Sequence, residues 1–333
     1  MATLYQTERT IINELIDSGV FTSTITSETK RGQKLAVYAL QKPATQQRIN
    51  ATFKTMFGEA PQNFQENLLF LSGAESLTAV EIHVLLATCK AVINAPELQG
   101  VTADRVIACV SLVTTVNSEV TEIDERKVRK LITKLFVDRF KLFTVDRPVE
   151  SEEETVSEVE EYWDVVPDFT NFVECLVGWL RADRTKQDLT DIQRVNRHLL
   201  QHRYLDAKQF PDLWVTLTQN KIAIESQWRE LQRFYLECGD QYALLLDDFR
   251  KPSESRQFYA AIRVAQSLGS GLPIAKYHHR IKTVWQQLYP DATFNLSLVK
   301  KTITDAALAT EVNGYVVATP LAKRYVIPTK KEN

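Results

Sequence analysis

The chain has 333 residues, of which 44% are hydrophobic and 25% charged, a globular composition that excludes a wholly disordered protein. Its 40 basic and 42 acidic residues give a formal net charge of −2, which argues against a dedicated nucleic-acid-coating protein. Local clusters of cations can nevertheless attract DNA to a nearly neutral chain.

Targeting signals and cysteine pairs are missing from the sequence. Residues 1–9 lack the apolar core of a signal peptide, and no apolar run reaches the roughly 20 residues that span a bilayer. We therefore expect a cytoplasmic protein without membrane contact. The sequence contains no C-x-x-C pair and so does not indicate a zinc site, and we expect the four cysteines to be buried free thiols. The cysteines are Cys89, Cys109, Cys175 and Cys238.

The N-terminal quarter alternates helical and strand-like patterns. Apolar residues at helical spacing predict a helix over residues 4–16, and Pro43 begins another that ends at Gly58. Residues 67–71 read as a strand. This order predicts a small winged-helix-like domain with a reduced wing in residues 1–75.

A second set of elements follows. A capping-box spacing at Thr78 begins a long helix, and another helix is expected over residues 103–116. A basic amphipathic helix over residues 125–136 precedes a strand over residues 140–145. We interpret residues 76–149 as a helical, second winged-helix-like module. The cations of the basic helix are Arg126, Lys127, Arg129, Lys130 and Lys134.

The clearest boundary signal is a glutamate-rich run. It contains Glu150, Glu152, Glu153, Glu154, Glu158, Glu160 and Glu161. Such a run repels itself, so we predict an acidic, solvated linker over residues 150–161. The alternative is an acidic tether on which a partner docks.

The remainder, residues 162–333, is predicted to be a helical region that ends in a C-terminal winged helix. Expected helices cover residues 227–237, 256–268, 277–288 and 296–309, and expected strands cover 242–246 and 315–318. Asn313-Gly314 predicts a hairpin turn before the last strand. On helix 296–309 we expect Leu298, Ile303, Ala306 and Ala307 to face the core.

Five residues near the C-terminus are candidates for DNA binding. Lys300, Lys301 and Thr304 would face outward from a recognition helix, and Lys323 and Arg324 would lie on a wing. The alternative is ordinary solvation of a surface helix. Overall, the fold class expected is mainly α with short β-hairpins, arranged as tandem winged-helix-like domains.

Catalytic and cofactor motifs are not found. The sequence has neither G-x-x-x-x-G-K-[ST] nor G-x-G-x-x-G, so no nucleotide cofactor is expected. His198 and His202 could form half of a metal site, but no H-E-x-x-H motif supports it. Asp247 and Asp248 follow a strand, as Mg²⁺ ligands of nucleases do, although a polar turn is commoner there. We therefore expect no catalytic residues, no metal and no enzyme activity.

The order of the C-terminal motifs resembles a known family. The pattern begins with the segment Gly239-Asp240-Gln241-Tyr242-Ala243-Leu244-Leu245-Leu246-Asp247-Asp248, which is followed by a helix, by Trp285 and by Leu298–Ala309. It ends with Val316-Val317-Ala318-Thr319-Pro320-Leu321-Ala322-Lys323-Arg324-Tyr325. This order resembles accessory subunits of bacterial SMC-like systems, and most of all the Wadjet plasmid-defence proteins that play the part of MukE or MksE.

That resemblance implies a tandem winged-helix (KITE) protein that forms a homodimer and binds a kleisin-type subunit and the SMC ATPase. It implies a non-catalytic subunit that bridges the kleisin and double-stranded DNA, in plasmid defence or chromosome condensation. Two alternatives remain open. One is a stand-alone winged-helix DNA-binding protein, such as a transcription regulator or a plasmid or phage replication initiator. The other is a metal-dependent nuclease that uses Asp247 and Asp248.

Overall fold

The computed structural model describes residues 3–26, 29–71, 77–99, 105–146, 161–182, 188–249 and 255–325. These residues are mainly helical, with 13 α-helices and small antiparallel three-stranded sheets. None of the helices in the described part of the chain has the length and apolar character that would be needed to cross a membrane. Two compact units are present: Met1–Gln201 with Glu230–Gln232, and His202–Arg229 with Arg233–Asn333.

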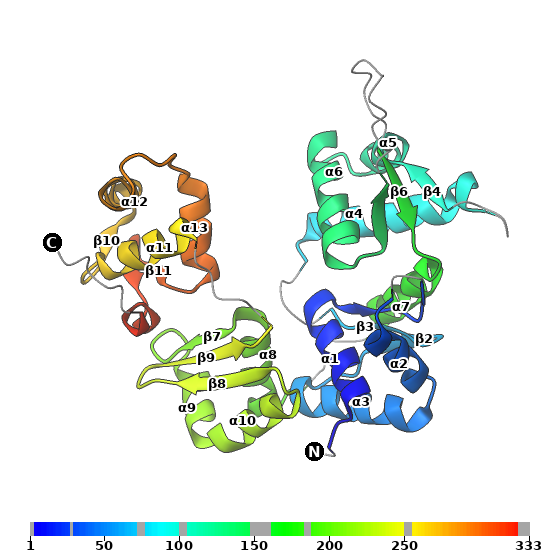
Figure 1. Cartoon of the computed structure of the whole chain (residues 1–333), viewed down its shortest axis with the longest axis horizontal. Coiled ribbons are helices and arrows are strands. Elements are labelled where there is room, and N and C mark those ends of the chain that lie inside the picture. Colours follow the sequence, from blue (N-terminus) through cyan, green and yellow to red (C-terminus); the bar gives the residue numbers. More distant parts are fainter. Residues whose placement is uncertain are drawn as a thin grey trace. The chain divides into compact units, whose positions relative to one another are not determined.

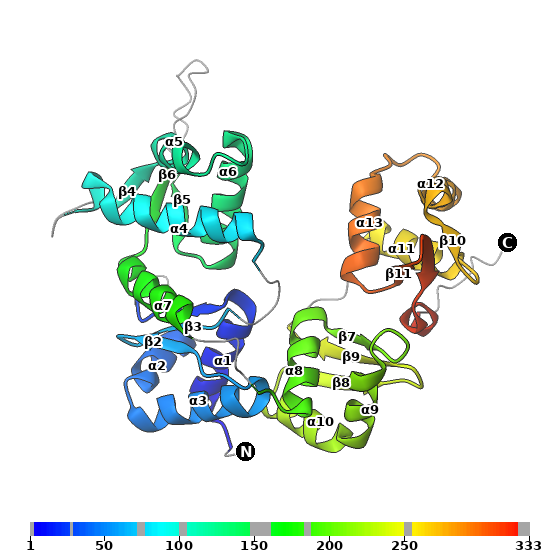
Figure 2. The same cartoon turned by 180° about the vertical axis from the view of Figure 1, so that it is seen from behind.

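One order of elements occurs four times in the described chain (Figures 1 and 2). It is helix, strand, helix, helix, strand, strand, and we call each occurrence a module. In every module the third strand lies between the first and the second, and both pairings are antiparallel. A mainly α chain with short β-hairpins, as expected from the sequence, is therefore confirmed.

Module 1 begins the first unit. It comprises α1 (Gln6–Ser18), β1 (Val20–Phe21), α2 (Arg31–Leu40), α3 (Pro43–Phe57), β2 (Gln62–Phe64) and β3 (Asn67–Leu69). Gly58 ends α3 with φ 80°, a left-handed conformation that glycine adopts without steric cost. The predicted helix from Pro43 to Gly58 is thus confirmed, and the predicted strand is present at Asn67–Leu69.

Module 2 also belongs to the first unit. It comprises α4 (Ala79–Asn94), β4 (Val106–Ala108), α5 (Cys109–Glu119), α6 (Glu125–Ile132), the π-helical turn η2 (Thr133–Arg139), β5 (Phe143–Asp146) and β6 (Tyr162–Val165), with the 3-10 turn η1 (Pro96–Leu98) after α4. The capping box is confirmed, because Thr78 and Glu81 exchange hydrogen bonds at the start of α4. The helix predicted over residues 103–116 is wrong at its start, where β4 pairs with β6.

The core of the first unit contains stacked aromatic side chains. Phe143 stacks on Phe136 and Trp163, with ring centroids 4.8 and 5.6 Å apart. After β6 comes α7 (Phe169–Arg181), which lies against β2 and β3 of module 1 and buries Phe172. The hairpin of module 1 is therefore covered by a helix of the same chain.

The acidic segment occupies an unexpected place in the topology. It lies between β5 and β6, and these strands pair directly, with Val145 opposite Trp163. The segment predicted as a linker thus connects two neighbouring strands of one sheet. Residues 147–160 lie outside the described residues, whereas Glu161 is described and contacts Arg129.

Module 3 begins with α8 (Asp191–His202) and continues through β7 (Tyr204–Asp206), α9 (Pro211–Gln219), α10 (Lys221–Glu230), β8 (Phe234–Cys238) and β9 (Tyr242–Asp247). The predicted strand over residues 242–246 is confirmed. The predicted helix over residues 227–237 is wrong beyond Glu230, because Phe234 already belongs to β8 and its side chain is buried.

Module 4 comprises α11 (Arg256–Gln266), β10 (Leu272–Pro273), α12 (Ile274–Leu288), α13 (Leu296–Asp305), β11 (Ala309–Val312) and β12 (Tyr315–Ala318), followed by the 3-10 turn η3 (Pro320–Arg324). Asn313 and Gly314 form the predicted turn, both with positive φ. Ile303 is buried as expected, but Leu298 is 42% exposed and Val299 fills the core instead. Leu298 was therefore wrongly assigned to the core.

Candidate nucleic-acid interface

The second and third helices of each module follow one another directly, as in helix-turn-helix proteins, where the later helix of the pair enters the DNA groove. The third helices are α3, α6, α10 and α13. Because the topology is the same in all four modules, the outward side chains of these helices can be compared directly. Only the cationic residues and their partners decide which helix suits a phosphate backbone.

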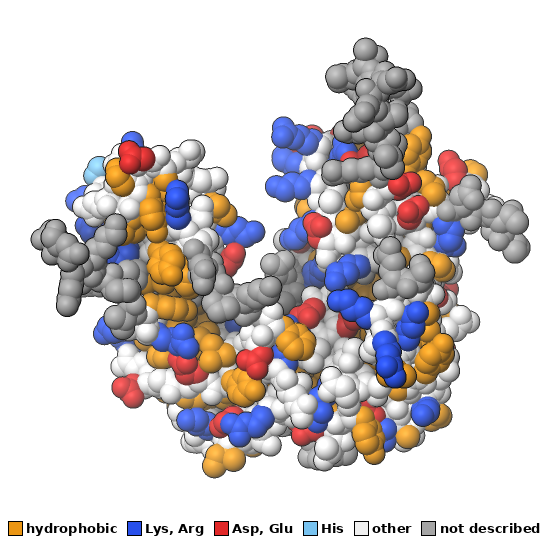
Figure 3. Space-filling view, viewed as in Figure 1, with side chains coloured by type: hydrophobic (Ala, Val, Ile, Leu, Met, Phe, Trp, Pro, Cys, Tyr) orange, Lys and Arg blue, Asp and Glu red, His pale blue; other side chains and the backbone are white. Residues whose placement is uncertain are grey.

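The third helix of module 2 has the most cationic outer face of the four. Asp124 caps α6 by accepting a hydrogen bond from the Lys127 backbone N–H at 2.9 Å. Val128 and Ile132 face the core and are fully buried. The exposed cations are Arg126, Lys127, Arg129, Lys130 and Lys134, and Figure 3 shows a column of basic side chains along this edge.

Three of these cations have acidic partners. Lys127 contacts Asp124 at 3.2 Å, Arg129 contacts Glu161 at 2.7 Å and Lys134 contacts Glu81 at 2.9 Å. Hydrogen bonds from the Lys127 backbone and side chain lower the pKa of Asp124, so this carboxylate remains charged at neutral pH. The pairs orient the cations without covering them, since the lysine and arginine side chains are about half exposed or more.

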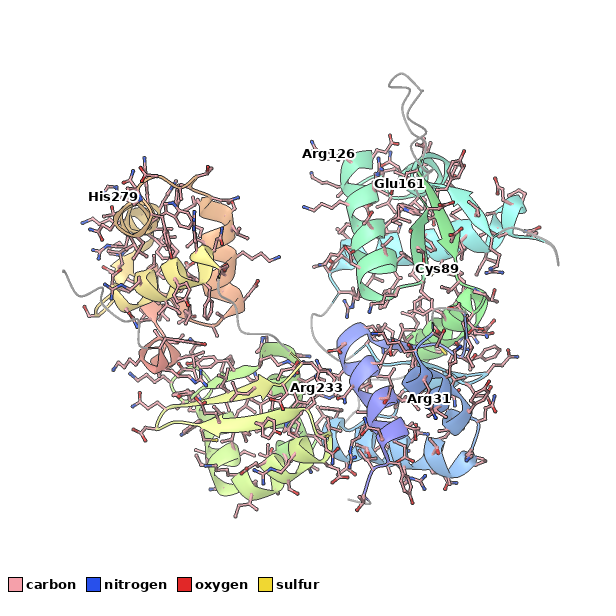
Figure 4. All side chains as sticks on the ribbon, viewed as in Figure 1. Arg31, Cys89, Arg126, Glu161, Arg233 and His279 are labelled. Carbon is pink, nitrogen blue, oxygen red and sulfur yellow. The ribbon has the colours of Figure 1, made fainter. Side chains whose placement is uncertain are left out.

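The remaining two cations, Arg126 and Lys130, form no ion pair or hydrogen bond within the described chain. Arg126 lies on the outer side of α6 (Figure 4). The two residues are four positions apart, so their like charges face each other across one turn and destabilise the helix by about 0.2–0.5 kcal/mol. A bound anion would attract both side chains and so offset their mutual repulsion. This arrangement therefore suits a polyanion that runs along α6.

The third helix of module 1 is engaged in contacts within its own unit. Arg48 binds the buried Glu8 at 2.6 Å, and its guanidinium lies 5.0 Å from the centre of the Tyr5 ring. At the other end of α3, Gln193 and Arg197 donate hydrogen bonds to the carbonyl groups of Lys54 and Phe57. These contacts engage the Arg48 guanidinium and leave Lys54 as the one exposed cation of α3 without an ion pair in the described structure, so α3 offers less positive charge than α6.

The third helix of module 3 has an apolar start. Ile222 on α10 is 85% exposed, and Arg229 is paired with Glu225 at 2.6 Å. Lys221 is the one exposed cation of α10 without such a pair in the described structure. This face offers much less positive charge than α6.

Three of the residues predicted to bind DNA lie together on α13 of module 4. Lys300, Lys301 and Thr304 are all exposed, as expected. The Lys300 ammonium lies 5.8 Å from the centre of the Tyr277 ring, and the Thr304 hydroxyl donates to the Lys300 carbonyl. α13 thus presents two cations, fewer than α6.

The other two predicted residues lie outside the β11–β12 hairpin. Lys323 and Arg324 belong to η3, which follows β12. Arg324 makes a bidentate contact with Glu237 of β8, at 2.8 Å from Nε and 2.9 Å from Nη2. The Arg324 contact is also the largest cause of the lowered pKa of Glu237. Arg324 is therefore already bound to a carboxylate.

Asp247, one of the two candidate nuclease carboxylates, is held in a buried ion pair. Arg233 (labelled in Figure 4) donates from Nε and Nη2 to the two oxygens of Asp247, both at 2.7 Å. The two side chains are only 4% and 3% exposed. The described residues contain no group of three or more His, Cys, Asp or Glu side chains that could hold a metal ion. His198 and His202 therefore belong to no such group.

The cysteines have the environment of structural residues. Cys89, Cys109 and Cys175 are buried as expected, whereas Cys238 is only partly buried. Burial raises the pKa of the Cys175 thiol to about 11 and raises that of Cys89 further. A protonated, buried thiol is a poor nucleophile.

The sequence showed α6 as a basic amphipathic helix but not as a candidate site. Its position as the third helix of a module depends on β4 and β6, which the sequence patterns did not reveal. The signal for this site that the sequence did contain is the pair of cations Arg126 and Lys130, spaced four residues apart on one helix face. Comparison with protein-family models, curated proteins and solved structures found no match to this chain.

Proposed function

We propose that this chain is a non-catalytic, DNA-associated binding subunit built from four winged-helix modules. The repeated order of elements, with the third strand central in each sheet, supports this assignment because it is the topology of a winged helix. The observation that carries the DNA contact is the unpaired cationic pair on the third helix of module 2. We propose that Arg126 and Lys130 contact the phosphates of duplex DNA, flanked by Lys127, Arg129 and Lys134.

The contact would be electrostatic and independent of sequence. Lysine and arginine on a helix face bind phosphates without reading bases, and the affinity then falls steeply with salt. A net charge of −2 for the whole chain fits weak binding that a larger assembly would reinforce. Such binding suits an architectural role better than recognition of a specific operator.

Fluorescence anisotropy with a short labelled DNA duplex tests the α6 contact. The double variant Arg126→Glu/Lys130→Glu should bind at least about tenfold more weakly at low salt, because two attractions become repulsions. The matched control is Lys54→Glu/Lys221→Glu, which makes the same charge change on the third helices of modules 1 and 3. Equal losses in both double variants would show a general charge effect and remove α6 as the interface.

The resemblance to Wadjet accessory subunits supports membership in an SMC-like complex, with a kleisin-type subunit and an SMC ATPase as partners and a homodimer as the free form. Light scattering coupled to size exclusion tests this role, on the chain alone and with the products of neighbouring genes. A dimer that joins a kleisin or SMC protein is expected. A monomer that ignores both would contradict the assembly role and leave the DNA contact standing.

A stand-alone DNA-binding protein is the second candidate, because the free cations of α6 would contact phosphates in that role as well. The two candidates differ in selectivity. A regulator or replication initiator would prefer its own site by a factor of about a thousand or more over random DNA. Selection of bound sequences from a random duplex library separates them, since an architectural subunit should enrich none.

A further inference from the structure

The sheet of module 4 ends in an open strand edge. Its strand order is β10-β12-β11, so β11 is an edge strand, and no other described strand pairs with its free side. The two-residue turn sets Val312 opposite Tyr315 and Thr310 opposite Val317. The backbone groups of Thr310 and Val312 therefore bond to β12, while those of Ala309 and Glu311 point to the open edge.

Two grooves flank this strand, one on each face of the sheet. The outer groove holds about 500 Å³ and is lined by Thr310, Val312 and Val317 together with more distant residues. The inner groove holds about 320 Å³ and lies between Glu311, Tyr277 and Ile303. An extended peptide paired with β11 would point alternate side chains to opposite faces, and so into the two grooves.

The exposed charges of the outer groove are cationic. Lys208 and Lys323 line it from modules 3 and 4, and neither has an ion pair within the described residues. The one acidic lining residue, Asp206, is buried and accepts hydrogen bonds from the Tyr204 hydroxyl and the Lys208 backbone. The inner groove contains one cation, Lys300, and one exposed acidic residue, Glu311, whose charges offset each other. A ligand with acidic side chains on its outer face therefore complements Lys208 and Lys323.

Apolar surface lies beside the edge. Val312 is 45% exposed and Tyr315 is 51% exposed, and they face each other at the end of the hairpin. A duplex would leave these side chains and the free backbone groups of Ala309 and Glu311 without partners. An extended peptide bonds the edge through its main chain, and the methylene groups of its acidic side chains cover Val312 and Tyr315, which lie on the face of the outer groove. Its apolar side chains enter the inner groove, which is lined by Ile274, Tyr277 and Ile303.

We propose that β11 docks an extended peptide segment of a partner protein, in which acidic and apolar side chains alternate, as a fourth strand of the module 4 sheet (β11 is labelled in Figure 2). The proposal does not depend on DNA binding by α6. It assigns Lys208 and Lys323, on the outer face, to the acidic side chains of the peptide, and Ile274, Tyr277 and Ile303, on the inner face, to its apolar ones.

The test uses the full chain and a fluorescein-labelled heptapeptide of alternating glutamate and valine. In Glu311→Pro the outward N–H is lost, while the bonds from Thr310 and Val312 to β12 remain, as an edge strand allows. We expect peptide binding to weaken by about tenfold or more in Glu311→Pro. The matched control, Glu311→Ala, keeps the N–H and should bind at least as tightly as the original chain.

Hydrogen exchange on the unaltered chain provides a second measurement that needs no variant. The peptide should slow exchange of the Ala309 and Glu311 amides, which face the edge, and change those of Thr310 and Val312 little. Equal binding by Glu311→Pro and Glu311→Ala would overturn the proposal. Preference for a heptapeptide of alternating lysine and valine, or protection of the edge by duplex DNA instead, would overturn it as well.

Discussion

At the scale of single residues, the Arg233–Asp247 pair is the most consequential contact of module 3. Both side chains are nearly inaccessible, and the guanidinium also lies 4.7 and 4.5 Å from the ring centres of Phe234 and Phe249. Removal of one partner would leave the other as an uncompensated buried charge. Asp247, which the sequence offered with Asp248 as a candidate metal ligand, is instead the partner of a buried arginine.

The first prediction concerns stability. Asp247→Ala should lower the free energy of unfolding of the second unit by about 3–5 kcal/mol, the usual cost of breaking a buried ion pair. Urea unfolding followed by tryptophan fluorescence measures it, since Trp228 lies in the same unit. Asp248→Ala is the control, because Asp248 is exposed and should change little. A comparable loss in both variants would contradict the assignment.

The second prediction follows the pH dependence of the same pair. Burial raises the pKa of Asp247, but the hydrogen bonds from Arg233 and the Phe249 backbone outweigh it, so the pKa is lowered. Because its pKa is lowered, Asp247 stabilises the fold at pH values above its pKa in the unfolded chain, about 3.9. This stability is lost as the pH falls through the lower pKa of Asp247 in the folded protein. The stability difference between the original chain and Asp247→Asn should therefore be constant near neutrality and shrink below about pH 4. A difference that grows on acidification would contradict this sign.

At the scale of elements, helices with end signals were predictable, whereas the short strands β4 and β10 were not. Pro43, Gly58 and the Thr78 capping box mark helix ends through local hydrogen bonds and backbone conformation, which the sequence encodes directly. β4 has three residues and β10 has two, too few for an alternating pattern to appear. Such strands exist because a partner strand pairs with them, which is non-local information.

The same limit explains the missed site. The cations of α6 were visible in the sequence, but their importance comes from the position of α6 in a module closed by β6. The acidic run between β5 and β6 interrupted that module in the sequence. Conversely, the sequence pattern placed Arg324 on a wing as a cation that could bind DNA, and only the fold shows that Arg324 is paired with Glu237.

The third prediction tests a helix start. Thr78→Ala removes the side-chain oxygen that accepts from the Glu81 backbone, and should destabilise the first unit by about 1 kcal/mol. Thr78→Ser keeps that oxygen and should be nearly neutral. Thermal unfolding monitored by circular dichroism compares the two. A stable Thr78→Ala variant would show that packing alone holds α4.

The fourth prediction concerns the electrostatics of α6. If Arg126 and Lys130 each neutralise one phosphate, their replacement by alanine should reduce the slope of log affinity against log salt by about 1.8. Affinity titrations at several salt concentrations measure the slope. An unchanged slope, with affinity reduced, would mean that the two residues act through the fold of α6 and do not contact phosphates.

At the scale of the whole molecule, the sheet of module 3 and module 4 are connected through η3 within the second unit. Gln266 of α11 donates to the carbonyl groups of Ala322 and Tyr325, and Arg324 reaches Glu237 of β8. The Tyr242 hydroxyl also donates to Glu237, at 2.9 Å. The end of module 4 is therefore fixed on the sheet of module 3 by a charged network.

The fifth prediction measures this connection by charge exchange. Glu237→Arg and Arg324→Glu should each destabilise the second unit, and the double exchange should recover part of the loss, with a coupling of about 1 kcal/mol. The exposed pair Arg229–Glu225 in the same unit is the reference, with an expected coupling of about 0.3–0.5 kcal/mol. Equal coupling in both cycles would show that Arg324 is an ordinary surface cation.

The hydrogen bonds of Glu230 have a consequence for the order of folding during synthesis. Its carboxylate accepts from the Leu4 backbone at 2.7 Å and its carbonyl accepts from Arg9 at 2.9 Å, and it belongs to the first unit although it follows that unit in the chain. Modules close mainly through contacts near in sequence, which form quickly as a chain leaves the ribosome. Arg48 can hold Glu8 as soon as module 1 is made, but the contacts of Leu4 and Arg9 with Glu230 can form only after residue 230 has emerged. A nascent chain stalled before that point should therefore expose its first residues to proteases, whereas one stalled well beyond it should protect them.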